Sequence, residues 1–480
     1  MNMTSFQRQR GFSLVELMIS VTISLVILGG LSAMLINVSR TNSEMAKSNS
    51  QIENGRFAVQ VLENDLVHAG FWGEYIPQFD DFSWLFIASD APATVPDPCK
   101  AYVADDFNSA TTTDWDFTHI NNLLGIGVQA SEDAPGTCAL TSKKAATDVL
   151  VVRHAATCIA GEPNCDAEVA GKLYLQAGMC TAGTWGTATG GGSNTIGLKP
   201  PSSTSNTSAV PNGYKGMRMR LLTGPGAGDT RVINGYDPST YTATVTGNWS
   251  TPPTIDTTYS IVDAELSTTT FPLRKRSCVA TDLAVKRKFE SNIYYIRDFA
   301  AVSGDGIPTL VRSSFDPAGP PALAHQAPQA LVEGIERFSV ELGIDHTRKR
   351  CLPHAPIDTE PLVRINPATC TTHLTDDTVN TLARNRGDGN ADEFVRCTTA
   401  VPCTAAQLQN AVATKIHLLV RNTEPTAGYT DSKTYCLATL AADGACPATS
   451  LAGPFNDGYK RHLFSTSIRL TTISGRRETP

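Results

Sequence analysis

The sequence lacks the patterns that mark a metal site or a hydrolase. Its twelve cysteines include no C-x-x-C pair, and its nine histidines include no pair at ligand spacing. No G-x-S-x-G occurs, and the glycine-rich GPGAG at 224–228 leads into a strand pattern instead of a helix, so it is no dinucleotide loop. We therefore expect neither enzymatic activity nor a cofactor.

Positive charge is not in excess either. The chain has 39 Lys and Arg residues against 46 Asp and Glu residues, which gives a formal net charge of −7. A chain of this balance has no general electrostatic attraction for nucleic acid, so we expect no nucleic-acid partner.

Charge and proline are both absent from Leu17 to Ser39, a run of 23 residues. At about 1.5 Å per residue, a helix of this length reaches roughly 35 Å and covers a hydrocarbon core of about 30 Å. The run therefore predicts one membrane-spanning helix near the N-terminus.

The residues before this run form a processing signal. Arg8 and Arg10 precede Gly11, then Phe12 follows, and Glu16 is the last charge before the apolar run. A secretory signal loses its apolar segment on cleavage, whereas here the segment follows the cleavage site and is retained. The stretch GFSLVE resembles the class III signal of type IV pilins, G-F-[ST]-L-[VI]-E.

This resemblance implies roles for three residues. A prepilin peptidase would cut after Gly11 and methylate the new N-terminus at Phe12. Glu16 would then pair with the N-terminal amine of a neighbouring subunit, since a carboxylate at the edge of a spanning helix needs a partner. The alternative is a plain signal anchor in which Glu16 lies at the level of the lipid headgroups.

The arginines before the span keep that side cytoplasmic by the positive-inside tendency. The remainder would lie in the periplasm, anchored in the inner membrane by a single pass, and later in the pilus at the cell surface. We divide the chain into a leader (1–11), the spanning half of a stem helix (12–39), its amphipathic half (40–70) and a β-rich head (71–480).

All twelve cysteines lie in the expected head, and an even number in an exported chain indicates disulfides. Many pairings are open. The short loops favour Cys158–Cys165, Cys397–Cys403 and Cys436–Cys446.

The amphipathic half of the stem is predicted from heptad spacing. Apolar residues recur every seven positions, with two more on the same side: Met45, Ile52, Val59 and Leu66, then Leu62 and Ala69. Gly70 is the expected stop.

Beyond the stem, apolar residues on one side of the chain predict strands at 338–344, 416–420 and 464–470, and DVLVVRH (148–154) and NIYYIRDF (292–299) are further strand candidates. We expect an α+β fold that is pilin-like, with the long N-terminal helix packed on an antiparallel sheet. Residues 181–213, rich in Gly, Ser, Thr and Pro, suit a loop, and 214–263 suit an inserted all-β subdomain.

A weak calcium candidate remains in the head. Asp388, Asn390 and Asp392 have the spacing of the first ligands of a calcium loop, but position six is Glu393 and position twelve is Thr399. A turn without metal is the favoured interpretation.

Four blocks together resemble the PilW family of type IV pilus minor pilins: residues 53–74, 331–345, 415–425 and 459–470. The family implies a subunit that helps to initiate or prime pilus assembly with other minor pilins, often beneath a tip adhesin. Its further partners would be the major pilin, the prepilin peptidase and the inner-membrane assembly platform. A pseudopilin of a type II secretion or DNA-uptake system is the alternative, because it shares the stem and the signal.

Overall fold

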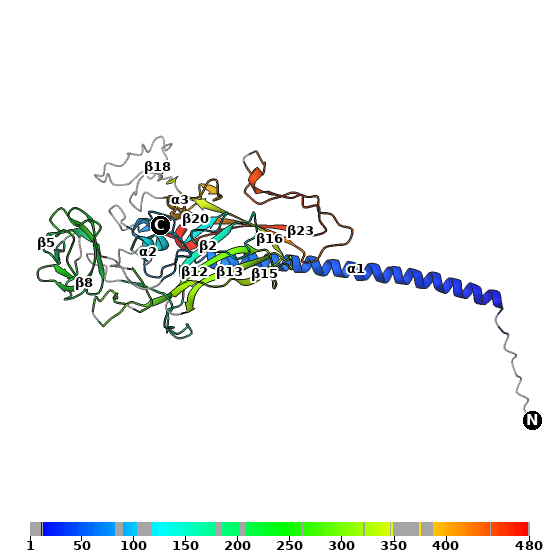
Figure 1. Cartoon of the computed structure of the whole chain (residues 1–480), viewed down its shortest axis with the longest axis horizontal. Helices are drawn as coiled ribbons and strands as arrows, with labels where there is room; N and C mark the ends of the chain where they lie inside the picture. Colours follow the sequence, from blue (N-terminus) through cyan, green and yellow to red (C-terminus); the bar gives the residue numbers. More distant parts are fainter. Residues whose placement is uncertain are drawn as a thin grey trace, which may run out of the picture.

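The computed structural model describes residues 11, 13–81, 90–102, 115, 117–178, 185–201, 207–261, 264–269, 271–279, 281–319, 322–345, 347–348, 374–375, 387–441 and 443–478. The α+β prediction is confirmed: one long helix, α1 (Leu14–Leu66), projects from a body built mainly of antiparallel strands (Figure 1). Three shorter helices accompany them: α2 (Phe117–Gly125), α3 (Ala405–Gln409) and α4 (Thr471–Arg477).

Two sheets form the body. The larger follows the order β1-β2-β12-β13-β14, and β3, β11 and β15 are added to it. Its strands are β1 (Val128–Ser131), β2 (Val149–Ala155), β3 (Tyr174–Ala177), β11 (Ala264–Ser267), β12 (Lys286–Arg297), β13 (Thr309–Gly319), β14 (Ala322–His325) and β15 (Gln329–Glu333). The smaller follows the order β19 (Glu393–Val395), β16 (Ile335–Ile344), β20 (Ala411–Arg421) and β23 (Arg461–Arg469). All five strands predicted from the sequence are present, as β2, β12, β16, β20 and β23.

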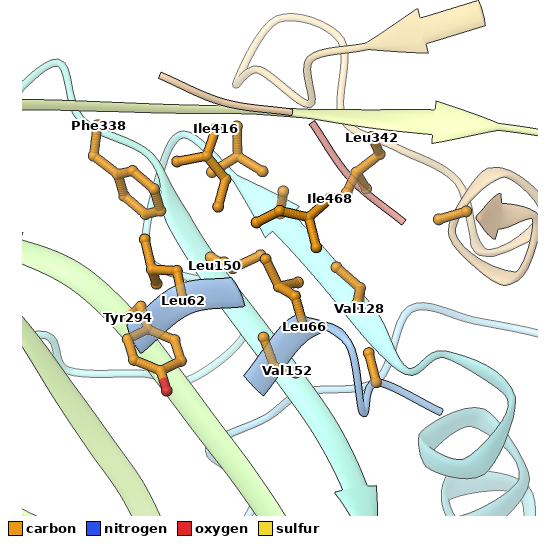
Figure 2. Packing of buried hydrophobic residues seen from close by; sticks show 14 of the residues in the cluster. Leu62, Leu66, Val128, Leu150, Val152, Tyr294, Phe338, Leu342, Ile416 and Ile468 are labelled. Atoms are coloured by element: carbon orange, nitrogen blue, oxygen red, sulfur yellow. The ribbon is translucent and has the colours of Figure 1, made fainter. Parts of the chain in front are cut away.

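The core lies between these sheets, around the end of α1. Leu62 and Leu66 are fully buried and point into a cluster that takes side chains from both sheets (Figure 2). Val128 and Leu150 come from the larger sheet, and Ile416 comes from the smaller one. The helix is therefore enclosed by two sheets, whereas the sequence analysis expected it to pack on one.

The buried stripe of α1 does not keep the predicted heptad. Its buried residues are Gln51, Gly55, Ala58, Leu62 and Leu66, followed by Ala69 after the helix. Steps of 4, 3, 4, 4 and 3 residues average about 3.6 residues per turn, the period of a straight helix, whereas a seven-residue repeat drifts by about 20° per heptad. Met45, three heptads before Leu66, is consequently 61% exposed. The predicted inward orientation of Met45 is wrong for this reason.

The end of α1 is tied to the larger sheet by a polar cluster. The Asp65 carboxylate accepts hydrogen bonds from Asn292 Nδ2 at 3.0 Å and Tyr294 OH at 2.9 Å, and it lies 2.7 Å from His154 Nε2. The other ring nitrogen of His154 faces the Ala155 carbonyl at 3.0 Å. Because both nitrogens face acceptors, the protonated imidazolium fits this position best.

We expect the His154–Asp65 contact to make stability depend on pH. Burial lowers the pKa of His154, but the hydrogen bond and the charge of Asp65 outweigh it and leave that pKa above its ordinary value of 6.5. The contribution is therefore complete below about pH 6.5 and is lost as pH rises through the folded-state pKa. Urea unfolding across this range should show a falling free energy of unfolding. In Asp65→Asn the decline should shrink, although Glu290 and His68 also face the ring; an unchanged slope would contradict the assignment.

A third sheet lies at the end of the molecule away from the stem (Figure 1). Its order is β4 (Trp185–Thr187), β10 (Thr258–Ile261), β7 (Arg218–Thr223), β8 (Thr230–Asp237), β9 (Thr242–Val245), β6 (Thr195–Gly197) and β5 (Gly190–Gly191). The first and last strands are separated by only two residues in the chain. Ala188 N donates to Thr257 O and Thr189 N to Gly197 O, so one segment closes the sheet into a small barrel.

The barrel corrects a boundary of the sequence analysis. Its strands begin at Trp185, so the loop expected at 181–213 is wrong over 185–197, and the all-β part begins before 214. Strands of two or three residues, most of them Gly or Thr, have no apolar run to reveal them. They exist because they pair with β10 and β9. The barrel has its own buried cluster, which includes Tyr259.

Candidate functional site: the exposed stem

The first half of α1 is an apolar surface without cover. From Leu14 to Val38 its large apolar side chains are between 49% and 78% exposed. The helix is long and apolar enough to cross a membrane. A surface of this kind is unfavourable in water, so lipid or other apolar helices must cover it.

Three hydroxyl groups in this half donate hydrogen bonds to the backbone of the helix itself. Ser20, Thr22 and Ser24 donate to the carbonyls of residues four positions earlier, at 2.6, 2.7 and 2.7 Å. Side chains paired with their own backbone need no water, which is the condition for entering a hydrocarbon core.

Gly29 and Gly30 leave two consecutive positions of the stem without side chains. A Cβ atom built on either would meet no atom within 4 Å. Nothing in the described chain requires glycine here. These positions permit the close approach of another helix, which is how small residues act in membrane helix pairs.

The N-terminal end of α1 is fixed by a reciprocal cap. Ser13 is the N-cap, with φ −72° and ψ 148°; its hydroxyl accepts from Glu16 N at 3.2 Å, while Ser13 N donates to the Glu16 carboxylate at 3.0 Å. This capping box satisfies two helix-end donors. Gly11 is exposed and precedes the helix, and Phe12 lies outside the described residues.

Glu16 therefore has a role that the sequence analysis did not assign. Among the described residues no cation lies within ion-pair distance of it, and its carboxylate is held by Ser13 alone. The S-x-x-E spacing of Ser13 and Glu16 was readable as a capping box in the sequence. The same carboxylate can hold its own helix end and remain exposed to a partner's charge.

The predicted cysteine pairs are present in the head. The disulfides Cys158–Cys165, Cys397–Cys403 and Cys436–Cys446 each close a loop of ten residues or fewer. A fourth bridge, Cys99–Cys138, spans 39 residues and was not foreseen, because no local signal links its ends. It packs over the outer face of β2, against Val149 and Val151, so this strand is buried on both faces.

The calcium candidate forms an ordinary turn. Asp388 Oδ1 accepts from the backbone and side-chain nitrogens of Asn390, at 3.0 and 3.2 Å. The Asp345 carboxylate binds the backbone nitrogens of Asp388 and Gly389. Within the described ranges no three His, Cys, Asp or Glu side chains converge as metal ligands.

Two family models match the chain. "Type IV Pilus-assembly protein W" matches residues 293–472, from within β12 to the start of α4, and "Prokaryotic N-terminal methylation motif" matches residues 6–32, which contain Gly11, Phe12 and Glu16. No curated protein and no solved structure matches the chain.

Proposed function

We propose that this chain, which matches the PilW model over residues 293–472 and the N-terminal methylation motif over residues 6–32, is a minor pilin of the type IV pilus. It helps to initiate pilus assembly and is placed at the filament tip with other minor pilins. The observation that carries the proposal is the union, in one chain, of a methylation motif on an uncovered apolar stem with a head that contains the PilW match. An uncovered apolar helix of this kind allows subunits to pack against one another through their stems.

The size of the head supports a tip or sparse position. By the usual scaling, a compact body of residues 71–480 has a radius of gyration of about 22 Å and a width of about 55 Å, whereas a helix is about 10–12 Å across. Stems packed side by side leave no room for such a head on every subunit. The chain is thus unsuited to be the repeating subunit of the shaft.

The same features support a proposal for where the chain works and for its partners. The stem anchors it in the inner membrane with the head in the periplasm, until it enters the pilus and reaches the cell surface. Its partners are the prepilin peptidase, the assembly platform, other minor pilins, the major pilin and a tip adhesin. After cleavage, the Glu16 carboxylate meets the methylated amine of a neighbouring subunit inside an apolar bundle, where an opposite charge is strongly attractive.

Processing is the first test. Gly11→Ala should leave the precursor uncut, while the wild-type chain should begin at methylated Phe12, because the bond after Gly11 lies just outside the helix. Mass spectrometry of the N-terminal peptide reads both results. Gly30→Ala is the matched control: it adds the same methyl group in open space and should be cut normally. A pilus-incorporated wild-type chain that still begins at Met1 would overturn the proposal.

A further inference from the structure

The segment between β20 and β23, residues 422–460, turns back onto the stem, and we call it the strap. It contains a short pair of strands, β21 (Tyr435–Cys436) and β22 (Leu451–Ala452), and the Cys436–Cys446 bridge. In Figure 1 it is the orange-red loop beside α1, at the end of the body from which the stem leaves. Its contacts with α1 fall at residues 40–51, directly after the apolar run.

Hydrogen bonds and ion pairs join the strap to the stem. Arg40 Nη2 donates to Ala427 O at 2.5 Å, and Lys47 Nζ donates to Pro425 O at 3.2 Å. Lys47 also lies 3.4 Å from the carboxylate of Glu424, which is exposed. One turn further along, Gln51 Nε2 donates to Lys460 O at 3.0 Å and to Val420 O of β20 at 2.6 Å.

Glu44 is the centre of this set. Its Oε2 atom accepts from Lys460 Nζ and from Thr426 Oγ1, both at 2.7 Å, and Lys47 lies 3.7 Å from the other oxygen. The hydrogen bond from Lys460, followed by that from Thr426, holds the pKa of Glu44 below its ordinary value. One carboxylate on the stem thus joins two parts of the strap that are 34 residues apart in the chain.

The strap is firmly held on its other side. Arg461, fully buried, forms ion pairs with Glu336 at 2.5 Å, Asp431 at 3.0 Å and Asp457 at 2.6 Å. The Asp431 carboxylate is fully buried as well. Breaking such a buried network is strongly unfavourable, whereas the Glu44 contacts are partly open to solvent and screened by salt. The weak side of the strap is therefore the side that faces the stem.

The close contact between Gly55 of the stem and Phe464 of β23 marks the point about which the stem can change its angle to the head. Gly55 packs against the ring of Phe464 so tightly that a Cβ atom would lie 2.2 Å from the ring. From Ala58 onward the helix is fixed by the buried apolar core. Before Gly55, the polar contacts with the strap and with Val420, and a hydrogen bond from Asn54 Nδ2 to Glu333 O, hold the helix to the body.

We propose that the strap is a releasable latch: its contacts with Arg40, Glu44 and Lys47 set the angle between stem and head. Once these contacts open and the hydrogen bonds of Gln51 and Asn54 follow, the stem pivots at Gly55. The latch is sensitive to ionic strength because its charged side chains, Glu44, Lys47 and Lys460, are partly exposed to solvent. It operates in the single chain, whether or not that chain primes pilus assembly.

The angle can be measured by double electron–electron resonance on the full detergent-solubilised chain. Spin labels at Met34→Cys on the stem and Val302→Cys on the head occupy positions that are 64% and 69% exposed. In 0.1 M salt we expect one narrow distance distribution. Glu44→Gln should raise the ratio of open to closed stems roughly tenfold, as expected for losing charge-assisted hydrogen bonds. Glu53→Gln, an exposed carboxamide change on the same helix, should leave the distribution narrow.

The unmodified latch gives a second measurement that needs no change at Glu44. At 1 M salt, where the screening length is about 3 Å, the doubly labelled chain should gain the open population seen in Glu44→Gln. Narrow distances in both Glu44→Gln and high salt would overturn the latch. Equal broadening in Glu53→Gln would also overturn it, because the angle would then not depend on the strap. Neither result bears on cleavage after Gly11, so failure of the latch and failure of the proposed function can be distinguished.

Discussion

Replacing Glu16 by glutamine should leave the protein processed and anchored but exclude it from pili. Glutamine at the third helical position keeps the capping box with Ser13, so the helix end survives. The negative charge is lost, and a neighbour's amine is left unpaired in an apolar bundle. At about 3–5 kcal/mol for breaking a buried pair, incorporation should fall about 100-fold or more. Immunoblots of sheared pili against whole cells give the incorporated fraction.

Ser13→Ala is the control that separates the two roles of Glu16. It removes the cap and keeps the charge, and the loss of a cap costs only about 1 kcal/mol. We therefore expect incorporation of Ser13→Ala to fall by a few-fold at most. The reverse order, with normal incorporation of Glu16→Gln and a defect in Ser13→Ala, would show that Glu16 serves the helix end alone.

Leu62→Ala should destabilise the head by about 2–5 kcal/mol. The side chain is fully buried between the two sheets, so its removal leaves a cavity that neither sheet can close without moving strands. Urea unfolding of the oxidised protein, followed by tryptophan fluorescence, measures the loss. Phe57→Ala on the same helix removes a larger side chain that is 51% exposed, and it should change stability by about 0.5 kcal/mol or less. Equal losses in the two variants would show that α1 is not held by this core.

The candidate site was largely readable because it is local. Gly11, Glu16 and the apolar run are neighbours in the chain, and the spanning helix needs no tertiary contact to be recognised. The disulfides Cys158–Cys165, Cys397–Cys403 and Cys436–Cys446 follow the same logic, since a short loop brings its own ends together. The capping partner Ser13 was within reach of the same reasoning.

The sequence by itself determined the elements: the stem, its processing signal, the five predicted strands and the oxidised character of the head. Tertiary structure alone decided how they meet. The rotation of α1 is set by the sheets around Leu62, which replace the heptad by a straight-helix period and expose Met45. Three further features join residues that are far apart in the chain: the Cys99–Cys138 disulfide, the closure of the barrel, and the hydrogen bonds between the strap and Glu44. Periodicity records which residues of one element share a face, but carries no information about the distant element that will cover it.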